Sequence, residues 1–126
     1  DDPGRARLQA CLARQRERLE SGDLLGASDA NADLHATLLE LSQHGTAVRL
    51  IHALNAQTVR YQYRTILIPG RPAASHAEHA AIVEATVAGR PDDAENAMRR
   101  HLLNVAEAVR HGPLAGGIDN ASRGAL

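Results

Sequence analysis

The sequence predicts an all-α fold, an antiparallel bundle of about five helices. Three observations lead to this prediction. Apolar residues recur at the three- and four-residue spacing of helices that turn one face toward a core. Gly and Pro interrupt this pattern at places that leave short turns between helices of ordinary length. Hydrophobic residues make up 44% of the 126 residues and aromatic residues only 2%, so the core must depend largely on Leu, Ala, Val and Ile, of which Leu and Ala are strong helix formers.

Each predicted helix has its own start and stop signals. Asp2 followed by Pro3 is typical of a helix start. Ser75 and Glu78 match a capping box, in which the serine oxygen accepts a hydrogen bond from a backbone N–H and the glutamate reaches back. Gly89 can adopt the left-handed conformation that ends a helix, and Pro91 suits the first position of the next one. These signals place the helices at about 2–20, 28–42, 47–68, 75–88 and 91–110.

The composition argues against several classes of protein. The chain has 14 basic and 15 acidic residues, so it lacks the overall positive charge that attracts nucleic acid. No apolar run approaches the ~20 residues of a membrane-spanning helix, and we expect no membrane partner. Cys11 is the single cysteine, which excludes an internal disulfide and fits a reducing compartment. We therefore expect a cytoplasmic protein.

The two ends of the chain differ from its centre. Residues 113–126 are rich in Gly, Ala and Ser without helical periodicity, so we predict a flexible C-terminal tail after a single helical domain at 1–112. The chain opens abruptly on Asp-Asp-Pro, which is typical of the edge of a fragment.

Three histidines fall on apolar helix faces. His35, His79 and His101 lie on the core-facing stripes of the second, fourth and fifth predicted helices, and Asn31 shares a face with His35 because it lies four residues earlier. A buried imidazole needs partners for both ring nitrogens, or a metal ion for one of them. The spacing therefore leaves two interpretations, a metal site with an open position or three separately hydrogen-bonded core histidines. The remaining histidines are predicted to lie on the surface, and they are His44, His52, His76 and His111.

These residues carry a resemblance to a known family. The chain resembles the FadR C-terminal domain (FCD) of GntR-family transcriptional regulators in the motifs Asn31-x-x-Leu34-His35, Ser75-x-x-Glu78-His79-x-x-Ile82-x-x-Ala85, Gly89, Ala94 and Met98-Arg99-x-His101-Leu102. The 21 residues between His79 and His101 match the usual spacing of that family. The resemblance covers about residues 8–109.

The resemblance implies an effector-binding domain. It implies that a divalent metal, most simply Zn²⁺ with Ni²⁺ or Mn²⁺ as alternatives, is bound by four ligands, namely Asn31, His35, His79 and His101. The metal and nearby polar groups would hold the carboxylate of a small organic acid. The candidate effector-binding residues are Asn55, Arg60, Arg64 and Asn104, and the alternative for the two arginines is a surface or interface role. Acid binding would change the geometry of a homodimer and hence how its winged-helix domains bind operator DNA.

Three departures from the family pattern have consequences. Asn31 stands where many metal-binding members have Asp, and a neutral amide should bind the metal less tightly while leaving the site more favourable to an anionic effector. Leu34 replaces a phenylalanine, which alters packing rather than chemistry. The winged-helix domain and the usual first helix of the domain are not found in this chain, so we do not expect the chain as given to bind an operator.

Three other functions stay open at this point. The same kind of domain could work without metal, with its histidines binding the acid directly. A three-histidine metal hydrolase is possible in principle, since such a site can activate water. We expect no enzyme, however, because Glu78 and Glu84 are predicted to lie off the histidine face, which leaves no obvious general base. A bare helical dimerisation module is the last alternative.

Overall fold

The computed structural model describes residues 2–112, apart from the side chains of 56–63. This part of the chain forms α1 (Pro3–Glu20), α2 (Leu24–Ser42), α3 (Gly45–Ile66), α4 (Arg71–Val87) and α5 (Pro91–His111), and it contains no strand. The predicted all-α bundle is thus confirmed. The predicted tail at 113–126 lies outside the described residues.

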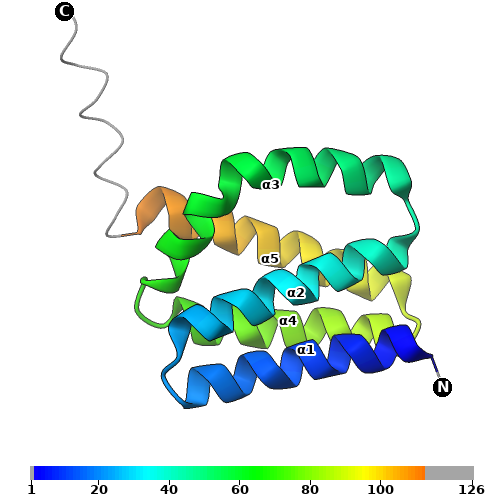
Figure 1. The fold of residues 1–126 in the computed structure, drawn as a ribbon, viewed down its shortest axis with the longest axis horizontal. Helices are drawn as coiled ribbons and strands as arrows, with labels where there is room; N and C mark the ends of the chain where they lie inside the picture. The colour runs from blue at the N-terminus through cyan, green and yellow to red at the C-terminus, as the bar shows by residue number, and fades with distance from the viewer. Residues whose placement is uncertain (1, 113–126) are drawn as a thin grey trace, which may run out of the picture.

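The helices run alternately up and down, and short turns connect them (Figure 1). α1 packs against α2 and α4, and α4 packs against α5. α3 lies at the opposite edge of the bundle from α1 and contacts α2, α4 and α5 (Figure 1). The second, fourth and fifth helices consequently stand between these two edges.

The apolar core lies mainly between α1, α2 and α4. Its fully buried members come from all three helices, and they are Leu8, Cys11, Leu34 and Val83. Leu12, Leu38 and Val87 pack against this cluster. None of the side chains described for α3 is buried, and Leu50 and Leu54 on that helix are 62% and 57% exposed. Among the described side chains, the core therefore joins α1, α2 and α4, and α3 contributes none to it.

The first and last helices begin where the sequence predicts. The Asp2 carboxylate accepts a hydrogen bond from the Gly4 N–H at 2.9 Å, and Pro3 occupies the first turn. Pro91 opens α5 in the same way, with acidic residues following it in the first turn. A proline at the first position loses no hydrogen bond, because the N–H that it lacks has no partner within a helix.

The start of α4 differs from the prediction. The helix begins at Arg71, so Ser75 lies inside it and the predicted capping box with Glu78 is wrong. Gly70, with a φ of 77°, makes the reversal into the helix, and Pro72 falls in the first turn, where a proline is tolerated. Pro72 therefore belongs to the helix, and α4 is longer than predicted by about one turn.

The starts of α2 and α3 also lie earlier than predicted. α2 begins at Leu24 because the Asp23 carboxylate accepts a hydrogen bond from the Gly26 N–H at 2.8 Å. α3 begins at Gly45 because the ring Nδ1 of His44 accepts a hydrogen bond from the Ala47 N–H at 3.2 Å. Each helix therefore includes a few residues before its predicted start. α3 ends at Ile66, two residues earlier than predicted.

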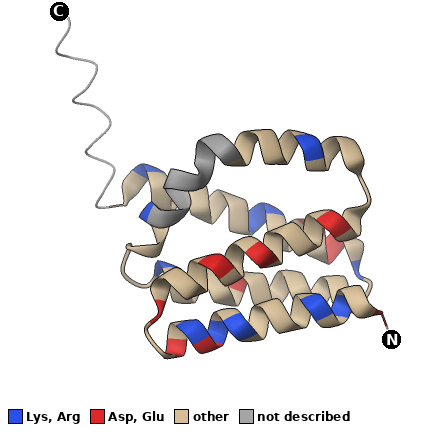
Figure 2. Ribbon diagram, viewed as in Figure 1, with Lys and Arg blue, Asp and Glu red and all other residues tan. Residues whose placement is uncertain are grey.

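The arginines of α1 face acidic residues of α2 and of the turn before it (Figure 2). The pairs are Arg7 with Glu40 at 2.9 Å, Arg14 with Asp33 at 2.6 Å and Arg18 with Asp23 at 3.0 Å. All six side chains are exposed, so each pair adds at most about 1 kcal/mol to stability. These arginines form a solvated face on which their charges are neutralised by the acidic partners.

None of the helices described in residues 2–112 combines the length and the apolar character that a membrane-spanning helix needs.

Candidate metal centre

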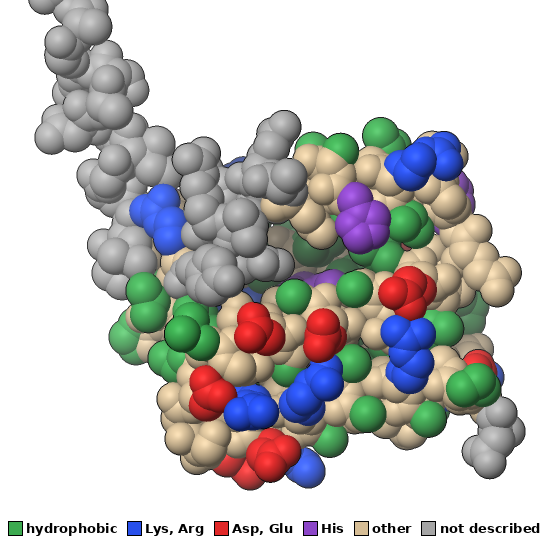
Figure 3. All heavy atoms as spheres, in the orientation of Figure 1, with side chains coloured by type: hydrophobic (Ala, Val, Ile, Leu, Met, Phe, Trp, Pro, Cys, Tyr) green, Lys and Arg blue, Asp and Glu red, His purple; other side chains and the backbone are tan. Residues whose placement is uncertain are grey.

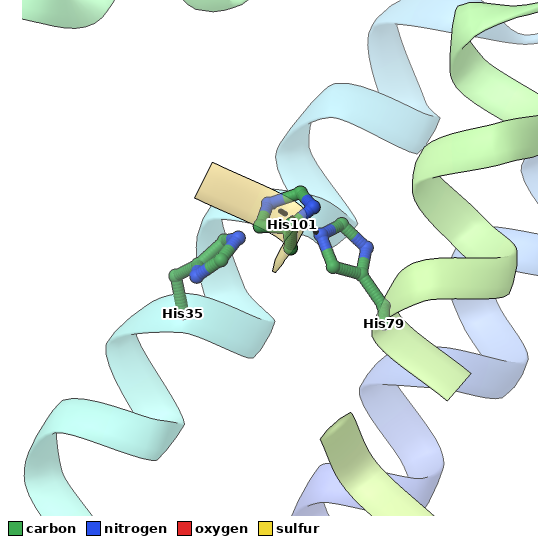
Figure 4. Close-up of side chains that lie close together, drawn as sticks. All are labelled: His35, His79 and His101. Carbon is green, nitrogen blue, oxygen red and sulfur yellow. Dashed lines mark hydrogen bonds between the residues drawn. The ribbon is translucent and has the colours of Figure 1, made fainter. Parts of the chain in front are cut away.

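The structure brings the three predicted histidines together. α2 supplies His35, α4 supplies His79 and α5 supplies His101, and their rings converge between these helices (Figure 4). One nitrogen from each ring lies within 4.8 Å of one from each of the others. The Nε2 atoms of His79 and His101 are 3.3 Å apart. Residues that are distant in the sequence thus form one compact group of nitrogen ligands.

Burial keeps two of these rings neutral. His79 is fully buried and His35 is partly buried. Burial, with a further contribution from His101, lowers the pKa of His35 to about 4. Burial, followed by the neighbouring His35 and His101, lowers the pKa of His79 to about 2. At neutral pH both side chains are therefore in the uncharged form, which is the form that binds metal ions.

The Glu78 carboxylate contacts the Nδ1 of His101, the ring nitrogen that does not face His79. Its Oε2 lies 2.6 Å from the Nδ1 of His101, and Arg71 donates two hydrogen bonds to the same carboxylate at 2.9 and 2.7 Å. Asn104 donates a further hydrogen bond to Oε1 at 2.8 Å. Burial acts to raise the pKa of Glu78, but the hydrogen bonds from Arg71, His101 and Asn104 outweigh it and lower the pKa to about 2. The carboxylate is consequently ionised.

Gln15 supports His79 in a similar way from α1. Its side-chain Oε1 lies 3.0 Å from the Nδ1 of His79 and 3.2 Å from the Nδ1 of His76. His76, which was predicted to lie on the surface, is partly exposed and contacts Gln15. The other three histidines predicted on the surface, His44, His52 and His111, are exposed.

The donor set fits a divalent transition metal. Zinc binds imidazole nitrogens at about 2.0–2.1 Å, so two nitrogens at corners of a tetrahedron around it lie about 3.3 Å apart. The separation of the His79 and His101 Nε2 atoms agrees with this value. Three neutral imidazoles suit zinc, nickel, copper or iron better than magnesium or calcium, which prefer oxygen ligands.

The other predicted site residues lie on α2, α3 and α5. Asn31 is one helical turn before His35 and is partly exposed, and no side-chain hydrogen bond of Asn31 occurs within residues 2–112 as described. Asn104 borders the centre through Glu78. On α3, Asn55 is exposed and Arg64 is partly buried near the C-terminal end. The side chain of Arg60 lies outside the described residues.

Sequence reasoning missed the supporting residues. Glu78 was predicted to lie off the histidine face, but its carboxylate contacts His101, so that prediction is wrong. The error arises because Glu78 precedes His79 on α4 and points in another direction, yet its long side chain reaches across to α5. Glu84 is exposed and pairs with Arg90 at 3.1 Å, away from the three histidines, as predicted. Gln15 could have been found from the sequence, because a polar amide on the apolar stripe of α1 indicates a buried side chain that needs a hydrogen-bond partner.

The molecular surface is hollowed beside the centre. Figure 3 shows a hollow between α3 and α2, with a histidine side chain at its floor. The partial exposure of His35 on α2 agrees with this view. A small molecule could therefore approach the histidine group from this face.

Comparison with known proteins places the chain in a family. The family model of the FCD domain matches residues 1–104, which is most of the chain. No curated protein and no solved structure matches the chain closely enough to count as a relative.

Proposed function

Since this chain belongs to the FCD family, the ligand-binding domains of GntR-family transcriptional regulators, we propose that it senses a small organic acid with the help of a divalent metal ion. His35, His79 and His101 would hold the ion, and Asn31 would be a fourth ligand from the same helix as His35. The observation that supports the metal most directly is the convergence of three imidazole nitrogens within 4.8 Å of one another. Zn²⁺ is the first candidate because three neutral imidazoles match its preferred ligands.

The chemistry of the site favours an anionic effector. None of the four proposed ligands carries a negative charge, so the positive charge of a bound divalent cation would stay uncompensated within the ligand set and would attract a carboxylate. The hollow between α3 and α2 gives such an acid a path to the centre (Figure 3). Asn104 next to Glu78, and Asn55, Arg60 and Arg64 on α3, are the side chains that we propose to contact the rest of the acid.

We further propose that this domain acts within a cytoplasmic homodimer whose winged-helix domains bind operator DNA. An acid can change DNA binding only if it binds one arrangement of the dimer more tightly than another. Residues of α2, α4 and α5 meet at the centre, so an acid bound there would favour one relative placement of these helices. The helical domain would comprise residues 1–112, followed by a tail.

The metal-free alternative has less support. An imidazole binds an acid most strongly when it is protonated, but the pKa values of His35 and His79 are lowered to about 4 and about 2. Both rings are therefore poor cationic donors at neutral pH. A hydrolase is also less well supported, because Arg71, Asn104 and His101 already engage the Glu78 carboxylate that would have to act as a general base.

Elemental analysis of the purified domain, with thermal shifts against metals and small carboxylic acids, tests the proposal. We expect about one metal ion per chain and a rise in melting temperature with zinc and with some acids. His79→Ala and His101→Ala should abolish metal binding, whereas His52→Ala, at an exposed position on α3, should not. Asn31→Asp should tighten metal binding, because it adds an anionic oxygen.

Two results would contradict parts of this proposal. Equal stabilisation of the His79→Ala variant and the wild-type domain by zinc would exclude the metal site. No gain in zinc affinity for Asn31→Asp in calorimetric titration would remove Asn31 from the ligand set and leave the three histidines.

A further inference from the structure

One partly buried and one buried polar side chain, Glu78 and Gln15, contact the Nδ1 atoms of the central histidines. Glu78 contacts the Nδ1 of His101, and Gln15 contacts the Nδ1 of His79. We propose that Glu78 and Gln15 are positioning residues that fix the tautomers of His101 and His79, so that both Nε2 atoms present lone pairs to the centre. The inference deepens the proposed metal-binding function and rests on it, but the tautomers themselves can be measured without any metal.

The contact with Glu78 decides the tautomer of His101. An ionised carboxylate can only accept hydrogen bonds, so the Nδ1 of His101 must carry the proton that lies between them at 2.6 Å. A neutral imidazole with its proton on Nδ1 has a lone pair on Nε2. The Nε2 of His101 is the atom that lies 3.3 Å from the Nε2 of His79.

The contact with Gln15 acts on His79 by the same reasoning. The Oε1 atom of Gln15 accepts hydrogen bonds and has two lone pairs, which match the Nδ1 atoms of His79 at 3.0 Å and of His76 at 3.2 Å. Gln15 is only 4% exposed, so water does not compete for this oxygen. With its proton on Nδ1, His79 also turns a lone pair toward the centre.

The Nε2 atoms of His79 and His101 lie at hydrogen-bonding distance, 3.3 Å, and such a bond requires a proton on one of the two nitrogens (Figure 4). In the proposed tautomers neither Nε2 carries a proton. The tautomers therefore leave both nitrogens without a mutual hydrogen bond and ready to bind a cation. Outer partners of this kind commonly orient histidine ligands and raise their basicity.

Arg71 holds Glu78 in place for this task. The guanidinium donates to both carboxylate oxygens at 2.9 and 2.7 Å, and the Arg71 side chain is only 9% exposed. Its Nε is the single buried side-chain nitrogen or oxygen without a hydrogen-bond partner among the described residues. Arg71 and Glu78 are seven residues apart, two turns along one face of α4. The pair is internally neutral, so it orients His101 without adding net charge beside the proposed cation.

Nitrogen-15 NMR of the metal-free domain in chelator measures the tautomers directly. In the wild-type domain we expect the proton of His79 and of His101 on Nδ1. In Glu78→Gln one carboxylate oxygen becomes an NH₂ group, which donates hydrogen bonds and therefore opposes one of the present donors, Arg71, Asn104 or the Nδ1–H of His101. We expect His101 to lose its strong preference for the tautomer with the proton on Nδ1. Gln15→Leu should have the same effect on His79. Glu84→Gln on α4 and Gln9→Leu on α1 replace exposed residues of the same types and should change neither ring.

Zinc affinity, measured by competition with a chelator, is the second readout. We expect Glu78→Gln and Gln15→Leu to bind zinc roughly 10–100-fold more weakly than the wild type, and the two control variants to bind it as the wild type does. A wild-type domain with its proton on Nε2 of either ring would overturn the proposal, even if a variant failed to fold. So would unchanged tautomers and affinities in folded variants of a domain that binds zinc. Absence of zinc binding by the wild type would instead overturn the proposed function, while the spectra still decide the tautomers.

Discussion

At His79, burial and the neighbouring histidines both lower the pKa, and they outweigh the Glu78 carboxylate, which acts to raise it. The ring is fully buried, and any proton added to it would lie close to His35 and His101. The pKa of His79 in the folded domain is therefore lowered from 6.5 to about 2, and that of His35 to about 4. In the unfolded chain both side chains return to ordinary values near 6.5.

This difference makes the metal-free domain sensitive to acid. Below pH 6.5 the unfolded chain binds protons that the folded domain excludes, so the stabilising effect present above pH 6.5 is lost as the pH falls toward 4 for His35 and toward 2 for His79. Between pH 7 and pH 5 we expect His79 alone to lower the free energy of unfolding by about 2 kcal/mol. Urea unfolding in chelator at the two pH values measures the loss.

Matched variants assign that loss to the buried ring. His79→Gln should reduce the dependence on pH, whereas His52→Gln at an exposed position should leave it unchanged. An equal loss in the His79→Gln variant would show that other groups cause the acid sensitivity.

The positions of the three histidines could be predicted from the sequence, whereas the side chain that contacts one of them could not. The convergence of His35, His79 and His101 could be predicted, because each occupies a core-facing position of its helix and the helices are neighbours in a small bundle. The contact of Glu78 with His101 could not, because it depends on how α4 is rotated against α5 and on which way a long side chain turns. Periodicity gives the face of a helix but not the reach of its side chains.

The starts of some helices could be predicted from the sequence and the starts of others could not. α1 begins at a proline that follows the capping residue Asp2, α5 begins at a proline that follows the turn at Gly89, and the bounds of both helices were predicted closely. α4 was misplaced because Pro72 can either end one helix or occupy the first turn of the next, and local sequence does not distinguish the two. The left-handed φ of Gly70 settles the choice in the structure.

Gly89 offers a test at this scale. It joins α4 to α5 with a φ of 68°, a conformation that a side chain disfavours although no atom would touch an added Cβ. We expect Gly89→Ala to lower the free energy of unfolding by about 1 kcal/mol, as measured in urea. Gly45→Ala is the control, because Gly45 has an ordinary φ and the nearest atom to its added Cβ is 3.8 Å away. That change should leave stability unaltered or raise it slightly, and equal losses at both sites would contradict the conformational explanation.

Across the whole molecule the helices are not held equally. α1, α2 and α4 share the buried cluster of Leu8, Cys11, Leu34 and Val83, whereas the described side chains of α3 are exposed or only partly buried. The hollow beside the histidines lies along α3 (Figure 3). A helix whose described side chains contribute nothing to the buried cluster therefore borders the proposed binding site, which is where ligand-binding proteins commonly have low local stability.

Hydrogen exchange followed by mass spectrometry tests this difference. We expect backbone amides at 47–55 in α3 to exchange faster than those at 7–16 in α1, because fewer buried apolar contacts oppose local opening of α3. Equal protection of the two segments in the metal-free domain would show that α3 opens only with the rest of the bundle.

The order of the three histidines along the chain has a consequence for when the proposed metal site can form during synthesis. His101 lies on α5, the last of the described helices, so in a growing chain His35 and His79 are synthesised well before their third partner. An ion bound during translation would meet an incomplete set of ligands and would exchange readily. The complete set exists only after α5 has docked, so the finished domain, rather than the nascent chain, would select the proposed metal ion.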